Sequence, residues 1–175
     1  MSIGGPDDGR DLSPPNRTLS HSRGTLGVLL YQPEIPQNTG NIARTCAATH
    51  TTLYLVGPLG FQITDRQLKR AGLDYWPYVR VKLYSDFESA RMDMRHCRLV
   101  YFSARAARAY YDFTFMAGDC LVFGPETRGL PEELPASYPG EILNVPIDRA
   151  RVRSLNLATT VGIALFEALR QLRHC

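Results

Sequence analysis

The sequence lacks several features that mark common protein classes. Only four of its 175 residues are cysteine, none in a Cys-x-x-Cys pair, and its four histidines have no zinc-site spacing. These counts predict reduced thiols and no metal site. No apolar run approaches the roughly 18 residues that a membrane helix needs, and no basic-then-apolar leader begins the chain. We therefore expect a cytoplasmic protein that contacts no membrane.

The usual nucleotide-binding and hydrolase motifs are also missing. No Gly-x-Gly-x-x-Gly follows an apolar strand, which argues against a dinucleotide fold. Gly124 and Gly129 have the separation of a P-loop, but Leu130-Pro131 stands where Lys-Ser/Thr is required. There is no Gly-x-Ser-x-Gly either. These absences exclude most common catalytic classes.

Lysine is scarce as well. Lys69 and Lys82 are the only lysines among the 20 basic residues, and the net charge is only +3. Arginine suits bidentate phosphate contacts and stacking on bases, although a GC-rich genome would produce the same bias. Arg149, Arg151 and Arg153 alternate within five residues. This cluster predicts a phosphate-binding loop.

Strand and helix patterns alternate along the chain. Residues 1–25 have few apolar side chains and predict a flexible tail, followed by one domain over 26–175. Strands are predicted at 26–31, 52–56, 79–83, 98–103, 120–123 and 141–145, and helices at 38–50, 64–71, 86–95 and 154–173. Asn38 or Thr39 and Ser154 are the expected caps of the first and last helix. The alternation predicts an α/β fold with a mainly parallel sheet flanked by helices.

Three unusual segments follow predicted strands. The first is Pro-Glu-Ile-Pro-Gln-Asn-Thr-Gly-Asn-Ile-Ala-Arg (33–44), whose amides and Arg44 suit phosphate or ribose oxygens at a helix start. The second is Phe-Gly-Pro-Glu-Thr-Arg-Gly-Leu-Pro (123–131), a tight loop carrying Glu126 and Arg128. The third runs from an apolar strand at 142–145 through the arginine cluster to Arg-Ser-Leu-Asn-Leu (153–157). Each could be a simple turn or cap, but together they indicate a binding site.

Together with Arg-Ala-Gly-Leu-Asp-Tyr (70–75), these motifs resemble the SPOUT superfamily of RNA methyltransferases. The resemblance is greatest to its TrmL (YibK-like) subfamily of tRNA wobble-nucleotide 2′-O-methyltransferases, and it covers residues 26–173. It implies a deep trefoil knot in the C-terminal part of the sheet. It also implies methyl transfer from S-adenosyl-L-methionine to the ribose 2′-hydroxyl of nucleotide 34, a cytidine or uridine derivative. S-adenosyl-L-homocysteine is the other product.

The resemblance also implies the site residues and the partners. The catalytic residues are Arg44, Ser154 and Asn156. The cofactor-binding residues are Phe102, Ser103, Gly124, Glu126, Val145, Ile147, Ser154 and Leu155. The RNA-binding residues are Asn38, Arg44, Arg128, Arg149, Arg151 and Arg153. The expected partners are a tRNA anticodon stem-loop and a second copy of the chain, joined through the knot region. An enzyme acting on another tRNA position or on ribosomal RNA, and a non-enzymatic RNA-binding module, remain as alternatives.

Overall fold

The structure is a computed structural model that describes residues 10–11, 25–61 and 78–172. Its strands are β1 (Arg10–Asp11), β2 (Gly27–Tyr31), β3 (Thr52–Val56), β4 (Arg80–Tyr84), β5 (Arg98–Phe102), β6 (Arg108–Ala109), β7 (Asp119–Phe123) and β8 (Glu141–Asn144). Its helices are α1 (Pro36–Ala48), α3 (Phe87–Asp93), α4 (Glu133–Ser137) and α5 (Leu157–Leu172), with a 3₁₀ turn η2 (Tyr110–Asp112).

The strands form one sheet in the order β1-β4-β3-β2-β7-β5-β8-β6. Every pair in it is parallel except β1 with β4. This arrangement confirms the predicted α/β fold with a mainly parallel sheet. The order is consistent with a C-terminal knot, which stays a prediction.

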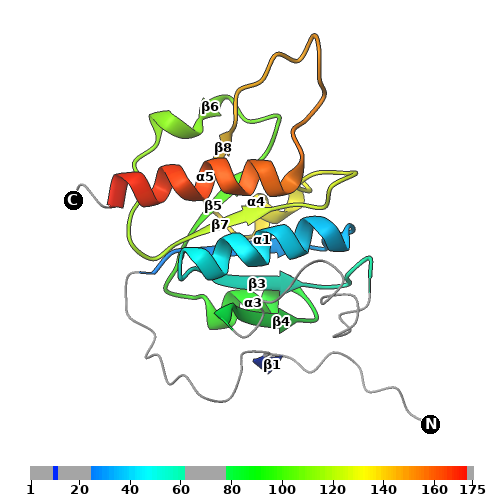
Figure 1. Cartoon of the computed structure of the whole chain (residues 1–175), viewed down its shortest axis with the longest axis vertical. Coiled ribbons are helices and arrows are strands. Elements are labelled where there is room, and N and C mark those ends of the chain that lie inside the picture. Colours follow the sequence, from blue (N-terminus) through cyan, green and yellow to red (C-terminus); the bar gives the residue numbers. More distant parts are fainter. Residues whose placement is uncertain (1–9, 12–24, 62–77, 173–175) are drawn as a thin grey trace.

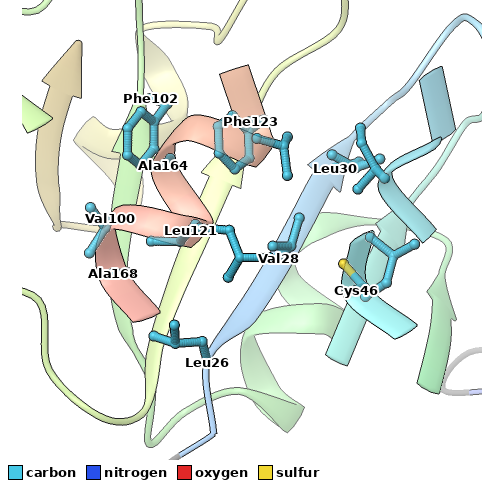
Figure 2. Packing of buried hydrophobic residues seen from close by; sticks show 14 of the residues in the cluster. Leu26, Val28, Leu30, Cys46, Val100, Phe102, Leu121, Phe123, Ala164 and Ala168 are labelled. Atoms are coloured by element: carbon cyan, nitrogen blue, oxygen red, sulfur yellow. The ribbon is translucent and has the colours of Figure 1, made fainter. Parts of the chain in front are cut away.

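Helices cover both faces of the sheet (Figure 1). Side chains alternate along each strand, so that Val28 and Leu30 pack on the side of α1 and α5, and Leu29 packs on the side of α3 and α4. Figure 2 shows the first of these clusters, with Ala164 and Ala168 of α5 lying over the strands. Because both faces of the sheet are buried at its centre, the central strands β2 and β3 are almost wholly apolar.

The first helix begins earlier than predicted. It starts at Pro36, which occupies a position where the missing N–H costs nothing, and its cap residue is Ile35 with no side-chain hydrogen bond. The prediction that Asn38 or Thr39 caps this helix is therefore wrong. Asn38 lies within the first turn and is buried, at 6% exposure. Its amide is thereby available for contacts across the site.

Some predictions lie outside the described residues, and some elements were not predicted. The helix at 64–71 and most of the tail at 1–25 fall in segments that the structure does not describe. Within the tail, Arg10–Asp11 pairs with β4. The strand β6, the turn η2 and helix α4 span only two to five residues, which is too short for periodicity to reveal.

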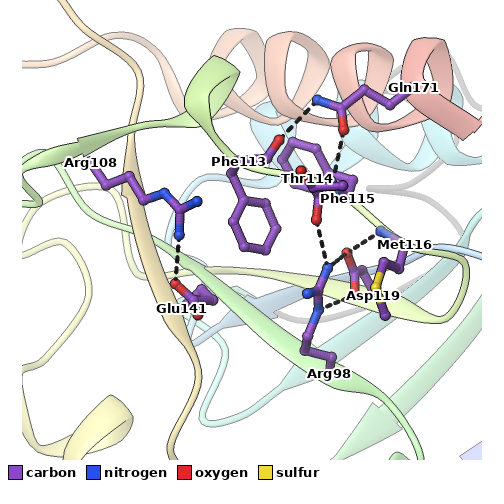
Figure 3. A network of polar contacts seen from close by, with 9 residues as sticks. All are labelled: Arg98, Arg108, Phe113, Thr114, Phe115, Met116, Asp119, Glu141 and Gln171. Atoms are coloured by element: carbon purple, nitrogen blue, oxygen red, sulfur yellow. Dashed lines mark hydrogen bonds and ion pairs between the residues drawn. The ribbon is translucent and has the colours of Figure 1, made fainter.

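A polar clamp closes the end of the sheet where β5 and β7 begin (Figure 3). Arg98 donates to both carboxylate oxygens of the buried Asp119, at 2.8 and 2.7 Å, and to the carbonyl of Thr114 at 2.9 Å. Gln171 of α5 donates to the carbonyl of Phe113 and accepts from the N–H of Phe115. The clamp therefore ties the segment between η2 and β7 to helix α5, at the end of the strands opposite their carboxyl ends.

The cysteines of the described part of the chain are free thiols. Cys46 and Cys120 are buried and Cys97 is half-buried. Burial raises the pKa of the Cys46 and Cys120 thiols above the ordinary value, so both stay protonated at neutral pH. The reduced state of these thiols stays a prediction.

Candidate active site

A pocket of about 390 Å³ opens where the neighbouring strands β7, β5 and β8 end. Its volume lies in the range of small-molecule sites, and the carboxyl ends of parallel strands are the usual place for such sites. The lining residues come from four segments. They are Ile35 and Asn38; Phe102, Ser103, Ala104 and Arg105; Phe123, Gly124, Pro125, Glu126, Arg128, Gly129 and Leu130; and Val145, Ile147, Ser154, Leu155, Asn156, Leu157 and Thr160.

Two aromatic rings line the pocket. Phe102 and Phe123 are paired in register at the ends of β5 and β7, and their rings are stacked with centroids 4.9 Å apart. Apolar side chains from the other loops, among them Leu130, Val145 and Ile147, also line the pocket. This apolar part suits a flat ring, and the polar groups beside it suit a ligand with one apolar and one polar end.

Gly124 allows two stretches of backbone to meet at the pocket wall. A Cβ at this position would lie 2.5 Å from the carbonyl carbon of Gly129 and would also overlap the backbone of Leu130. No side chain can yield here, because both neighbours are main chain. Only glycine permits this turn.

A chain of hydrogen bonds joins the three motifs of the sequence. Glu126 accepts from the Asn38 side chain at 3.1 Å, and Asn38 accepts in turn from the Asn156 side chain at 2.9 Å. Glu126 also accepts from the N–H groups of Glu34 and Ile35, at 2.8 and 3.2 Å. Because Glu126 accepts from the Asn38 NH₂ group, the Asn38 oxygen faces Asn156, whose NH₂ group donates to it. The three motifs therefore form one rigid unit at the pocket.

Asn156, rather than Ser154, caps the last helix. Its side-chain oxygen accepts from the N–H groups of Ala158 and Thr159, at 2.9 and 3.3 Å, and α5 begins at Leu157. The prediction that Ser154 caps a helix starting at residue 154 is therefore wrong. Because its side chain has both an acceptor and donors, Asn156 can cap α5 with its oxygen and donate to Asn38 at the same time.

We expect Asn156→Ala to destabilise the protein by about 2 kcal/mol. The change removes a helix cap, at about 1 kcal/mol, and leaves the buried oxygen of Asn38 without its donor, at about 1–3 kcal/mol. Urea unfolding of wild type, Asn156→Ala and Asn156→Ser measures this. Serine keeps a capping oxygen, so Asn156→Ser should lose less unfolding free energy than Asn156→Ala. A change below about 0.5 kcal/mol for alanine would contradict this role.

Glu34 is a site residue that the sequence analysis missed. Its carboxylate accepts from the Thr127 N–H at 2.9 Å and from the Thr127 hydroxyl at 2.7 Å, and Arg128 lies 3.8 Å away. The Thr127 hydrogen bonds, with the Arg128 charge as a smaller cause, lower the pKa of Glu34 below its ordinary value. Its position in the first motif was visible, but no single-sequence signal links it to residue 127.

The pocket brings together most of the residues that the sequence analysis selected. Those that line it are Asn38, Phe102, Ser103, Gly124, Glu126, Arg128, Val145, Ile147, Ser154, Leu155 and Asn156. Arg44, Arg149, Arg151 and Arg153 do not line it, and all four are exposed. Asn38 and Arg44 both lie in α1, six residues apart, so they do not share a helix face.

The predicted phosphate-binding loop borders the pocket. It connects two lining segments, since Ile147 precedes it and Ser154 follows it. In Figure 1 this orange connection between β8 and α5 projects away from the helix. Asp148 pairs with Arg151 at 3.2 Å. The loop therefore presents arginine side chains to solvent beside the mouth of the pocket.

The described ranges 10–11, 25–61 and 78–172 contain no group of three or more histidine, cysteine, aspartate or glutamate side chains that could hold a metal ion. No helix in those ranges is both long and apolar enough to cross a membrane.

The amino-acid sequence matches known RNA methyltransferases over most of its length. A protein of Methylovorus glucosotrophus named tRNA (cytidine(34)-2′-O)-methyltransferase is 44% identical over 145 residues, covering 82% of this chain and 94% of its own. A protein of Synechocystis, provisionally given the same name, is 49% identical over 151 residues, covering 83% of this chain and 96% of its own.

Solved structures agree with these sequence matches. One that concerns the 2-OH methylation of C/U34 on tRNA superposes with a TM-score of 0.81 at 48% identity, covering 88% of this chain and all of its own. An AdoMet-bound rRNA methyltransferase of Sinorhizobium meliloti superposes with a TM-score of 0.75 at 28% identity, covering 86% of this chain and 58% of its own. The model of the SpoU rRNA methylase family matches residues 25–166. The chain therefore belongs to the SpoU methylase family, which confirms the resemblance found in its motifs.

Proposed function

We propose that this protein transfers a methyl group from S-adenosyl-L-methionine to the ribose 2′-hydroxyl of nucleotide 34, a cytidine or uridine derivative, in tRNA. The observation that carries this proposal is the identity of 44–49% to named tRNA (cytidine(34)-2′-O)-methyltransferases over nearly their whole length. The reaction leaves S-adenosyl-L-homocysteine and a 2′-O-methyl ribose.

The pocket fits this cofactor. Its apolar walls suit an adenine ring, and the Gly124 turn brings main-chain groups to the pocket wall. The residues that would hold it are Phe102, Ser103, Gly124, Glu126, Val145, Ile147, Ser154 and Leu155. The cofactor supplies a methyl group on positively charged sulfur, so the protein has only to bind and orient it and the RNA.

The arginines outside the pocket suit the RNA. We propose that Arg149, Arg151 and Arg153 bind backbone phosphates of the anticodon stem-loop, with Asn38 and Arg128 at the pocket itself. The three arginines are exposed on a loop that borders the pocket. Phosphate contacts of this kind position an RNA without reading its bases.

Arg44 has a different proposed role. Arginine side chains in proteins are effectively always protonated, so Arg44 suits binding of the phosphate next to the reacting hydroxyl and stabilisation of the developing alkoxide. Proton removal is the less suitable role for the same reason. Ser154 and Asn156, which line the pocket, are the other residues that we place beside the reacting group.

We also propose that the protein is a homodimer and that it acts on tRNA in the cytoplasm. Helix α5 exposes Phe166, at 57% of its surface, on the side away from the core. A stable interface normally buries about 1,600 Å², which a second copy could supply. Light scattering at micromolar concentration should give twice the chain mass of 19.6 kDa. A mass near that of one chain would contradict the dimer.

Neutral substitution of Arg149, Arg151 or Arg153 should weaken tRNA binding and flatten its salt dependence. Each lost phosphate contact should reduce the slope of log affinity against log salt by about one. The rate at saturating tRNA should change little, because binding shared by the ground and transition states leaves the chemical step unchanged. Because Asp148 pairs with Arg151, replacing Arg149 or Arg153 should have the larger effect. An unchanged slope in all three variants would contradict phosphate binding.

Incubation of purified protein with methyl-labelled cofactor and tRNA transcripts tests the proposed function. We expect label in transcripts with cytidine or uridine at position 34, and none in a matched transcript with a 2′-deoxy nucleotide there. Label that persists in the deoxy transcript would contradict the assigned acceptor. Label in ribosomal RNA alone would support the alternative enzyme class.

A further inference from the structure

One wall of the pocket is formed by residues 124–131 in the connection between β7 and α4, which we call the 124–131 loop. Within residues 123–130 every residue except Thr127 lines the pocket. Thr127 instead donates both its N–H and its hydroxyl to Glu34, which lies in the connection between β2 and α1. Thr127, which does not line the pocket, is therefore bound by a residue of the first motif.

Glu34 makes this contact without touching the pocket itself. Its two carboxylate oxygens accept from the Thr127 hydroxyl at 2.9 and 2.7 Å, and one of them accepts from the Thr127 N–H at 2.9 Å. The guanidinium of Arg128, a lining residue, lies 3.8 Å from the same carboxylate. Hydrogen bonds to an ionised acceptor are the stronger ones.

The backbone of Glu34 is itself fixed. Its N–H donates to Glu126 at 2.8 Å, and the carbonyl of the preceding Pro33 accepts from Gly60 at 2.9 Å. A Cβ on Gly60 would lie 2.8 Å from the Cα of Glu34, so these two stretches of main chain are in direct contact. Glu34 therefore contacts the 124–131 loop from a segment that is itself packed against Gly60.

Besides the contacts of Glu34 with Thr127 and Arg128, the loop is restrained by the hydrogen bonds that Glu126 accepts from Asn38, Glu34 and Ile35. The loop contains Gly124 and Gly129, and Gly129 has a φ of +70°. One internal hydrogen bond joins the Gly129 N–H to the carbonyl of Pro125. Two glycines give such a loop many conformations when its contacts are lost, and a ligand that needs one of them must then supply the ordering free energy.

We propose that Glu34 is a positioning residue that holds the 124–131 loop in its binding-competent conformation through Thr127, and so raises affinity for S-adenosyl-L-methionine. The inference rests on the proposed function for the identity of the ligand. Glu126 performs the reciprocal contact, since its carboxylate reaches from the 124–131 loop to the N–H groups of Glu34 and Ile35. The loop is thereby tied in both directions to the segment that precedes α1.

Calorimetric titration of the full chain with S-adenosyl-L-homocysteine tests the proposal. Glu34→Ala should raise the Kd about tenfold or more, because it removes several hydrogen bonds to a charged acceptor. Thr127→Val keeps the N–H and should have a smaller effect, and Thr127→Ser keeps both donors and should bind as wild type does. The double variant Glu34→Ala/Thr127→Val should match Glu34→Ala alone, since the shared contact is already gone.

Glu167→Ala is the matched control. This carboxylate also accepts charge-assisted hydrogen bonds, from Arg170 at 2.8 Å, but it lies on α5 away from the lining residues. Its variant should bind S-adenosyl-L-homocysteine as wild type does. At saturating cofactor, Glu34→Ala should regain most of its single-turnover rate, because only loop ordering is lost.

Two outcomes separate this proposal from the proposed function. Wild-type affinity in Glu34→Ala, or additive effects of Glu34→Ala and Thr127→Val, would overturn the positioning role alone. A wild-type protein that does not bind S-adenosyl-L-homocysteine would overturn the proposed function, and this inference with it.

Discussion

Replacing Arg44 with alanine should lower the single-turnover rate of methyl transfer by about 10²–10³ at saturating tRNA, which is the usual cost of removing one transition-state stabiliser. The cofactor Kd should stay near that of wild type, because Arg44 is not among the residues that line the pocket. Rapid-quench measurement of methyl transfer, with calorimetry for the cofactor, measures both quantities.

Arg95→Ala is a suitable control for this experiment. Arg95 is an exposed arginine that follows α3 on the other side of the sheet, and it contacts His96. Its loss changes the charge equally and should leave the rate unchanged. Full recovery of the Arg44→Ala rate at high tRNA concentration would show that Arg44 only binds RNA, and its assignment to the chemical step would be wrong.

Gly124→Ala should weaken cofactor binding at least about thirtyfold. Its new Cβ would overlap the backbone of Gly129 and Leu130, so the 124–131 loop must move. Overpacking of this kind costs roughly 1–3 kcal/mol or more, and about 2 kcal/mol corresponds to thirtyfold in Kd. Titration with S-adenosyl-L-homocysteine measures the change.

Gly162→Ala makes the same chemical change in the middle of α5. A Cβ there meets no atom of the described chain within 4 Å, and alanine is the better helix former. This variant should keep the wild-type cofactor affinity and unfold at slightly higher urea concentration. Equal affinity in Gly124→Ala and wild type would contradict the assignment of the 124–131 loop to the cofactor.

The sequence predicted the sheet well because both of its faces are buried. Runs such as 26–31 and 120–123 are almost continuously apolar, which is typical of strands that helices cover on both faces. The caps were predicted less well. Asn38 and Ser154 are good capping residues by type, but Pro36 starts α1 earlier, and Asn156 caps α5. Local preference could not show that Asn38 is needed across the pocket.

The contacts that unite the site link residues far apart in the chain. Asn156 contacts Asn38 and Thr127 contacts Glu34, at separations of 118 and 93 residues. Periodicity and local motifs report only on neighbours, so a single sequence carries no signal for these pairs. The motifs that contain them were nevertheless recognisable, because each combines glycine or proline with polar side chains just beyond a strand. The sequence therefore predicted which segments form the site, and the structure was needed to show how they connect.

The central claim is that nucleotide 34 of tRNA is the natural acceptor. Mass spectrometry of tRNA from a strain that lacks this protein tests it most directly. We expect the 2′-O-methyl group at position 34 to disappear from one or more tRNA species, and to return with wild-type protein but not with Arg44→Ala. Unchanged methylation at position 34, with loss of a 2′-O-methyl group at another RNA position, would contradict the account.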